Sequence, residues 1–97
     1  MYDSKECVKI ITRYLPRIQQ EFGVTGLSLF GSVARGDNRP DSDIDILVEM
    51  PPKIFMMCAL KEFLESILKA SVDLIRKHSH LSQKFIDRIS HDSITIL

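Results

Sequence analysis

The residues best suited to chemistry lie in one short segment, where Gly31-Ser32 is followed, after ten intervening residues, by Asp43-Ile44-Asp45. Gly31 lets the backbone turn sharply and approach a ligand closely, and free N–H groups at the start of a helix opened by Ser32 attract phosphate oxygens. Asp43 and Asp45 project from the same face of an extended chain, where unneutralised carboxylates repel one another. Mg²⁺ relieves such repulsion, and it commonly binds one or two carboxylates together with phosphate oxygens. The segment therefore predicts a site for a phosphate-bearing substrate and a divalent cation.

The distribution of charge agrees with this prediction. The 97 residues contain 13 basic and 13 acidic side chains, a balance that argues against a protein that holds extended nucleic acid. Between positions 37 and 49, however, Arg39 is the one base among five acids, which are Asp37, Asp41, Asp43, Asp45 and Glu49. We therefore expect a cation to bind in this stretch.

Hydrophobic spacing predicts the elements that position these residues. Residues 3–22 are expected to form a helix that Pro16 divides and Gly23 ends. Strands are expected over residues 27–30, 43–50 and 72–75, with Asp73 facing away from its apolar neighbours. Leu81, Phe85, Ile86 and Ile89 mark a last short helix. This order predicts one domain over residues 1–97, a small α/β or α+β fold with a mixed sheet of three to four strands flanked by helices.

Another helix is expected between the second and third strands, with an apolar stripe that covers the sheet. The stripe comprises Ile54, Met57, Cys58, Phe63, Leu64, Ile67 and Leu68. Both cysteines, Cys7 and Cys58, lie within such apolar patterns and are interpreted as core thiols, not as a disulfide. No apolar run is long enough to span a bilayer and the N-terminus does not read as a secretion signal, so a cytoplasmic protein is expected.

The segment from Phe30 to Gly36, Phe-Gly-Ser-Val-Ala-Arg-Gly, leads to Asp-Ser-Asp-Ile-Asp-Ile-Leu-Val over residues 41–48. This pattern resembles the minimal nucleotidyltransferases of the DNA polymerase β-like superfamily, which include the MntA-type antitoxins of HEPN/MNT toxin-antitoxin pairs. The resemblance extends through the flanking helices and through Ser71–Ile75, so it covers nearly the whole chain. It implies the nucleotidyltransferase fold.

The resemblance also implies roles for individual residues. Asp43, Asp45 and Asp73 would be the catalytic acids that hold two Mg²⁺ ions, and Asp73 would orient or deprotonate the attacking hydroxyl. Gly31 and Ser32 would bind the ATP substrate, with Ser32 on the terminal phosphates. Arg35 would either contact the triphosphate or pair with a surface acid such as Asp37.

A chain of this length leaves no room for a second domain that grips an acceptor, so a partner is expected to present it. The resemblance implies a HEPN-domain ribonuclease toxin as that partner, with AMP transferred from ATP to a tyrosine. Two alternatives remain: an antitoxin that neutralises the toxin by binding alone, and a catalytic subunit of a small-molecule nucleotidyltransferase. Lys84 and Arg88 on the last helix, and the Pro51-Pro52 loop, are candidate edges of the partner surface.

Overall fold

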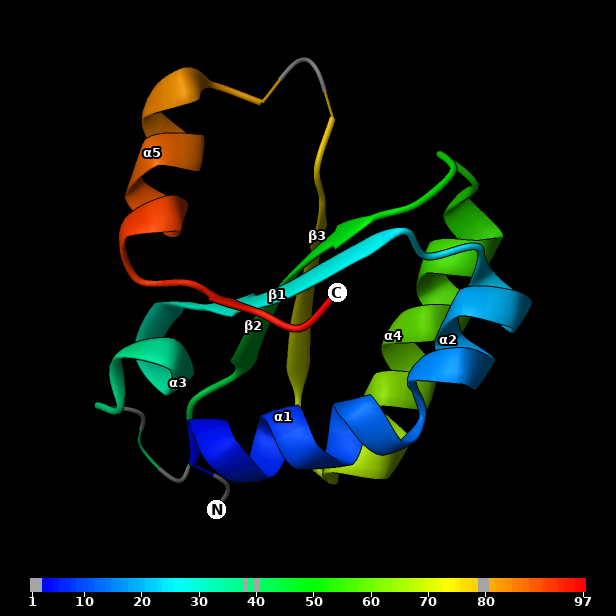
Figure 1. The fold of residues 1–97 in the computed structure, drawn as a ribbon, viewed down its shortest axis with the longest axis horizontal. Helices are drawn as coiled ribbons and strands as arrows, with labels where there is room; N and C mark the ends of the chain where they lie inside the picture. Colours follow the sequence, from blue (N-terminus) through cyan, green and yellow to red (C-terminus); the bar gives the residue numbers. More distant parts are fainter. Residues whose placement is uncertain (1–2, 38, 40, 79–80) are drawn as a thin grey trace.

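The computed structural model describes residues 3–37, 39, 41–78 and 81–97. Helices and strands follow one another along the chain as shown in Figure 1. Their bounds are α1 (Ser4–Arg13), α2 (Leu15–Phe22), β1 (Gly26–Phe30), α3 (Gly31–Arg35), β2 (Ile44–Glu49), α4 (Ile54–Leu68), β3 (Val72–Arg76), α5 (Gln83–His91) and β4 (Ile94–Thr95). The predicted mixed α/β architecture is therefore confirmed, and β4 is the one strand that the sequence pattern did not predict.

The N-terminal helical segment is divided, as predicted, and the division falls at Tyr14 between α1 and α2. Pro16 occupies the first turn of α2, where its missing N–H breaks no helical hydrogen bond. Asp3 caps α1 by accepting a hydrogen bond from the Glu6 backbone N–H at 2.9 Å. Gly23 ends α2 in the left-handed conformation, with φ of 67°.

The four strands form one sheet in the order β3-β2-β1-β4. Strand β1 is antiparallel to both β2 and β4, whereas β2 and β3 run parallel because α4 connects them across the sheet. Alternate residues of β2 are buried, so one face of the sheet is apolar. The buried residues from the three main strands are Leu27, Leu29, Ile44, Ile46, Val48 and Val72.

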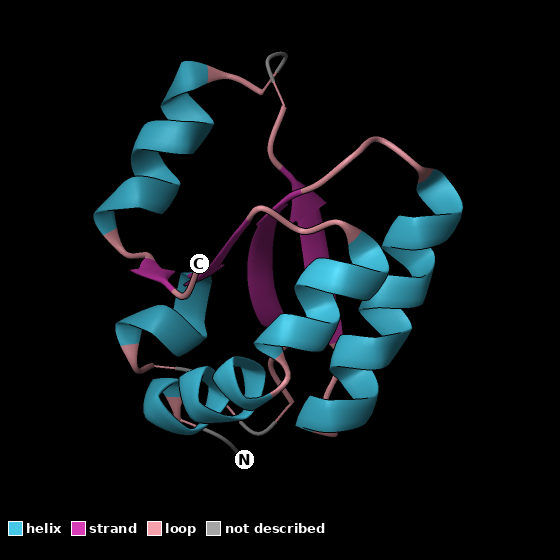
Figure 2. Ribbon diagram, turned by 45° about the vertical axis from the view of Figure 1, so that its right-hand side comes forward, coloured by secondary structure: helices cyan, strands magenta, loops and turns pink. Residues whose placement is uncertain are grey.

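Helices α1, α2 and α4 cover this apolar face, as Figures 1 and 2 show. Their inward side chains are Cys7, Ile11, Ile18, Phe22, Leu60, Leu64 and Leu68. Helix α5 lies on the other side of Figure 1 from α2 and α4, and Ile89 is its one buried hydrophobic residue among those the structure describes. The core therefore lies almost wholly on one side of the sheet.

The predicted apolar stripe of α4 is correct in its second half and at Met57, which packs against the core, but it is wrong at Ile54 and Cys58. Leu64 and Leu68 are fully buried, but Ile54 is 72% exposed and Cys58 is also exposed. Cys58 is thus not a core thiol, whereas Cys7 is buried, and both are free. Helical periodicity shows which side of a helix is apolar, but it does not show how far along the helix the sheet extends.

No helix in the described ranges has both the length and the apolar character needed to cross a membrane.

The start of α3 depends on a backbone conformation that favours glycine. Gly31 has φ of 73° and lies directly against Asp45 on β2. A Cβ atom at position 31 would overlap the Asp45 carboxylate oxygen and lie 3.0 Å from its Cγ atom. Gly36, at the end of α3, has φ of 83° but no neighbouring atom within 4 Å of such a Cβ.

These two glycines make a matched pair for mutation. We expect Gly36→Ala to destabilise the protein by about 1–2 kcal/mol through backbone strain alone. Gly31→Ala should cost about 1–3 kcal/mol more, because the added methyl group also displaces Asp45. Urea denaturation of both variants measures the difference. In an Asp45→Ala background the extra cost of Gly31→Ala should shrink; an unchanged extra cost would show that contact with Asp45 is not its origin.

Candidate active site

The predicted acids lie on the face of the sheet opposite the helices α1, α2 and α4. In the register of the strands, Phe30 pairs with Asp45 and Asp45 pairs with Asp73. Because paired residues on neighbouring strands point to the same face, these three side chains form a row across β1, β2 and β3. The row lies at the end of the sheet where β1 leads into α3.

Asp45 occupies the centre of this row in a half-buried position. Burial is the main cause that raises the pKa of its carboxyl group above the ordinary value of 3.8. The negative charges of Asp73 and Asp43 raise this pKa further, and the positive charge of Arg35 partly opposes them. Hydrogen bonding with the Asp73 side chain, the smallest of these causes, also raises the pKa of Asp45. Without a cation, the pair is therefore a site of unbalanced negative charge.

Helix α3 brings the predicted nucleotide-binding residues beside Asp45. Gly31, Ser32, Arg35 and Asp45 all line one cavity of about 320 Å³. The Arg35 Nε atom donates a hydrogen bond to the Asp37 carboxylate at 3.3 Å, in an ion pair exposed to solvent. The predicted surface pairing of Arg35 with Asp37 is therefore observed, and its contact with a triphosphate stays a prediction, although Arg35 lines the cavity.

Asp43 and Asp73 lie near enough to Asp45 for their charges to raise its pKa, but neither lines this cavity. Strand β2 begins at Ile44, so Asp43 precedes the strand and is exposed instead of lying within it as predicted. Within the described part of the chain, no group of three or more His, Cys, Asp or Glu side chains is arranged to hold a metal ion. The structure therefore pairs Asp45 with Asp73 on neighbouring strands, whereas Asp43 lies just before β2.

The same cavity contains residues that the sequence interpretation did not assign to the nucleotide site, although it named Arg88 as a candidate edge of the partner surface. Phe85, Arg88 and Ile89 of α5 line it, as does Asp92 just beyond that helix. The apolar spacing predicted the helix, but it could not show that the helix returns to the end of β1. An edge-to-face contact between Phe30 and Phe85, with ring centroids 6.5 Å apart, connects α5 to this end of the sheet.

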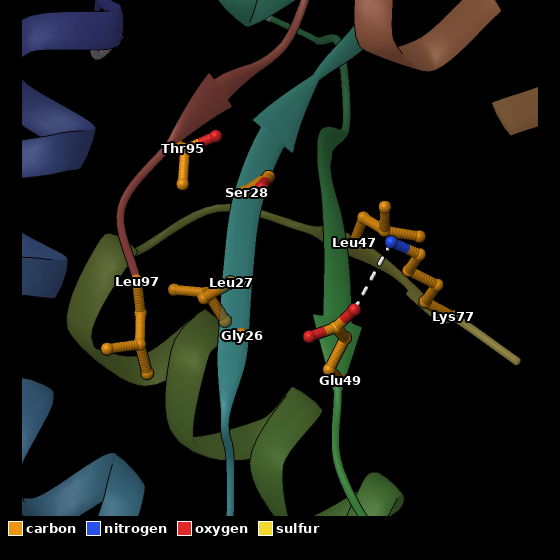
Figure 3. Close-up of a pocket in the computed structure, with 8 residues that line it drawn as sticks. All are labelled: Gly26, Leu27, Ser28, Leu47, Glu49, Lys77, Thr95 and Leu97. Carbon is orange, nitrogen blue, oxygen red and sulfur yellow. Dashed lines mark ion pairs between the residues drawn. The ribbon is translucent and has the colours of Figure 1, made fainter. Parts of the chain in front are cut away.

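A second cavity, of about 210 Å³, lies toward the other end of the same face (Figure 3). Glu49 and Lys77 form an ion pair at 3.2 Å on one side of it, and Leu97 lies on the other. The charges of that pair neutralise each other, and none of the predicted site residues lines this cavity. The features that suit phosphate and cation binding are thus concentrated at the α3 end.

Comparison with known proteins shows which family the chain belongs to. Residues 11–96 match the sequence model of nucleotidyltransferase domains. Protein adenylyltransferase MntA of Thermococcus cleftensis is 37% identical over 81 residues, which cover 81% of this chain and 82% of the relative.

Solved structures show the same fold. A candidate minimal nucleotidyltransferase matches with a TM-score of 0.77 and 26% identity, over 96% of this chain and 95% of the other. A chain from the Shewanella oneidensis complex of a tri-AMPylated HEPN toxin with an MNT antitoxin matches with a TM-score of 0.64 and 19% identity, over 93% of this chain and 71% of the other. From the match over residues 11–96 and the identity to the Thermococcus relative, the chain belongs to the nucleotidyltransferase domain family.

Proposed function

We propose that this chain is a protein adenylyltransferase that transfers AMP from ATP to a tyrosine hydroxyl of a HEPN-domain ribonuclease toxin, and so acts as an antitoxin. The observation that carries the proposal is the paired carboxyl groups of Asp45 and Asp73 beside the cavity that Gly31 and Ser32 line. The adenylyltransferase name of the Thermococcus relative supports AMP transfer. The AMPylated HEPN toxin in the Shewanella complex supports a HEPN toxin as the acceptor of AMP.

The donor set fits a hard divalent cation such as Mg²⁺. Such an ion needs only one or two carboxylates when phosphate oxygens and water complete its coordination, so three preassembled protein ligands are not required. Asp45 and Asp73 would each provide a carboxylate ligand for the cation. Asp43 would provide a further carboxylate when a second ion binds with the nucleotide. When bound, the ions neutralise negative charge on the phosphates and on the carboxylates.

The remaining roles follow from where each group lies. Ser32 would hold the terminal phosphates by its hydroxyl group, and Gly31 would let the backbone approach them closely. Arg35 would contact a phosphate from the same cavity. The acceptor oxygen would attack the α-phosphorus, the bond between that phosphorus and the bridging oxygen would break, and pyrophosphate would leave. Asp73 would accept the proton of the attacking hydroxyl on a carboxylate oxygen.

Transfer of AMP should depend on Mg²⁺ and on the paired acids Asp45 and Asp73. The protein should move label from ATP labelled in the α-phosphate to the proposed HEPN-domain partner when Mg²⁺ is present. Asp45→Asn should reduce the rate by at least about 100-fold, because it removes a charge that balances the cation. Asp73→Asn should act similarly. Labelling and intact mass of the partner measure the transfer.

Glu62→Gln is the control, since Glu62 is exposed on α4, the helix that covers the opposite face of the sheet. It should transfer AMP at the wild-type rate. If no label moves while the wild type and Asp45→Asn silence the partner equally, neutralisation occurs by binding alone. If label moves to a small molecule instead, the chain is a subunit of a different nucleotidyltransferase.

Asp45 should also affect the stability of the protein without metal. Folding raises the pKa of Asp45, so the folded state favours the protonated form. The contribution of the Asp45 carboxyl group to stability is therefore fully present below the ordinary carboxyl pKa. It is lost as the pH rises through the raised pKa. Asp45→Asn removes this loss and should stabilise the metal-free protein at pH 7 by less than about 1 kcal/mol, because the group is partly solvated.

Urea denaturation between pH 3.5 and 8 measures this effect. The advantage of the Asp45→Asn variant should be absent at the acid end and reach a plateau near neutrality. Adding Mg²⁺ with a non-hydrolysable ATP analogue should reverse the order, because only the wild type gains from cation binding. A variant that is less stable than the wild type at every pH would contradict the inference that burial and neighbouring charges make the ionised Asp45 carboxylate unfavourable in the folded state.

A further inference from the structure

The face of α5 that meets the sheet is not used in the proposed chemistry, yet it forms part of the same cavity as Gly31, Ser32 and Asp45. The volume of about 320 Å³ lies within the range typical of small-molecule sites, roughly 300–1,000 Å³. A nucleotide whose phosphates lie beside Ser32 and Asp45 therefore extends toward α5. The side chains of α5 then determine which parts of the nucleotide are held.

Arg88 has the charge and geometry for the phosphate side of the cavity. Among the described residues, Arg88 forms no salt bridge, whereas Lys77 in the cavity of Figure 3 is neutralised by Glu49. An arginine guanidinium presents several N–H donors in a planar fork that matches phosphate oxygens. Arg88 and Arg35 are both cationic residues of this cavity. Together they can balance phosphate charge that lies outside the reach of the cations at Asp45.

Phe85 has the shape and position for the nucleoside. Its ring is half-buried and is held by the edge-to-face contact with Phe30, in which the planes are inclined by 81°. The buried Ile89 fixes the same face of α5 against the sheet. Aromatic side chains held in this way offer a surface on which a nucleobase stacks. Asp92 also lines the cavity, and a carboxylate there suits ribose hydroxyls, not phosphates.

We propose that α5 forms one wall of the nucleotide site, with Arg88 binding the polyphosphate and Phe85 packing against the nucleoside. This inference rests on the proposed function, because it takes a nucleoside triphosphate as the ligand. It gives α5 a role in recognising ATP, separate from the acids that act on the reacting phosphate.

Calorimetric titration tests the two contacts separately, with a non-hydrolysable ATP analogue and Mg²⁺ in one series and adenosine in another. Arg88→Gln should weaken binding of the ATP analogue by about ten-fold or more, and should leave adenosine binding unchanged, because adenosine carries no phosphate. Phe85→Leu should weaken both ligands by a similar factor, about five-fold or more. Arg88→Lys should recover part of the affinity for the ATP analogue, since it restores the charge without the fork.

Lys84→Gln is the matched control, because Lys84 is an exposed base on the same helix and does not line the cavity. It should leave both affinities at the wild-type level, and melting temperatures of all variants confirm that they fold. If Arg88→Gln weakens the ATP analogue no more than Lys84→Gln does, or weakens adenosine equally, the inference is overturned while the proposed function stands. If the wild type binds no ATP analogue at all, both the inference and the proposed function fail.

Discussion

The close approach of two carboxyl groups on neighbouring parallel strands is the constraint on which the site depends. Paired positions on adjacent strands place Asp45 and Asp73 side by side, and like charges directly opposite one another destabilise a sheet. The strands nevertheless pair there, because Ile44, Ile46 and Val72 are buried on the other face and fix the register. A one-residue slip would bury the acids and expose the core. Hydrophobic packing on one face thus holds together charges that repel on the other.

The turn into α3 adapts to the same pair of acids. Asp45, the second residue of β2, lies against Gly31, the first residue of α3, and the space between them admits no side chain at position 31. Glycine there meets two separate requirements, a left-handed backbone and close contact with a carboxylate. The turn proposed to bind phosphate and the strand proposed to bind a cation are consequently one packed unit. Movement of either alters the spacing between a bound phosphate and the acids.

The sequence predicted those parts of the fold that depend on local patterns. Alternation around Ile46 identified β2 and the face of Asp45, and the position of Gly23 identified the end of α2. The neighbour relation between Asp45 and Asp73 is different, because it depends on how α4 returns the chain to the sheet. The exposure of Ile54 likewise depends on where the sheet ends. Such relations are set by packing between distant segments, which spacing along the chain does not encode.

The position of α5 follows from the one-sided core. Since α1, α2 and α4 already bury one face of the sheet, α5 can pack only at the end of the open face, where Phe85 meets Phe30. It contributes little to the core, with Ile89 as its buried hydrophobic residue in the described chain. Substitutions at its exposed positions should therefore change the free energy of unfolding only slightly. The buried core lies on one face of the sheet and the proposed ligand site on the other, because alternate residues of each strand point to different faces.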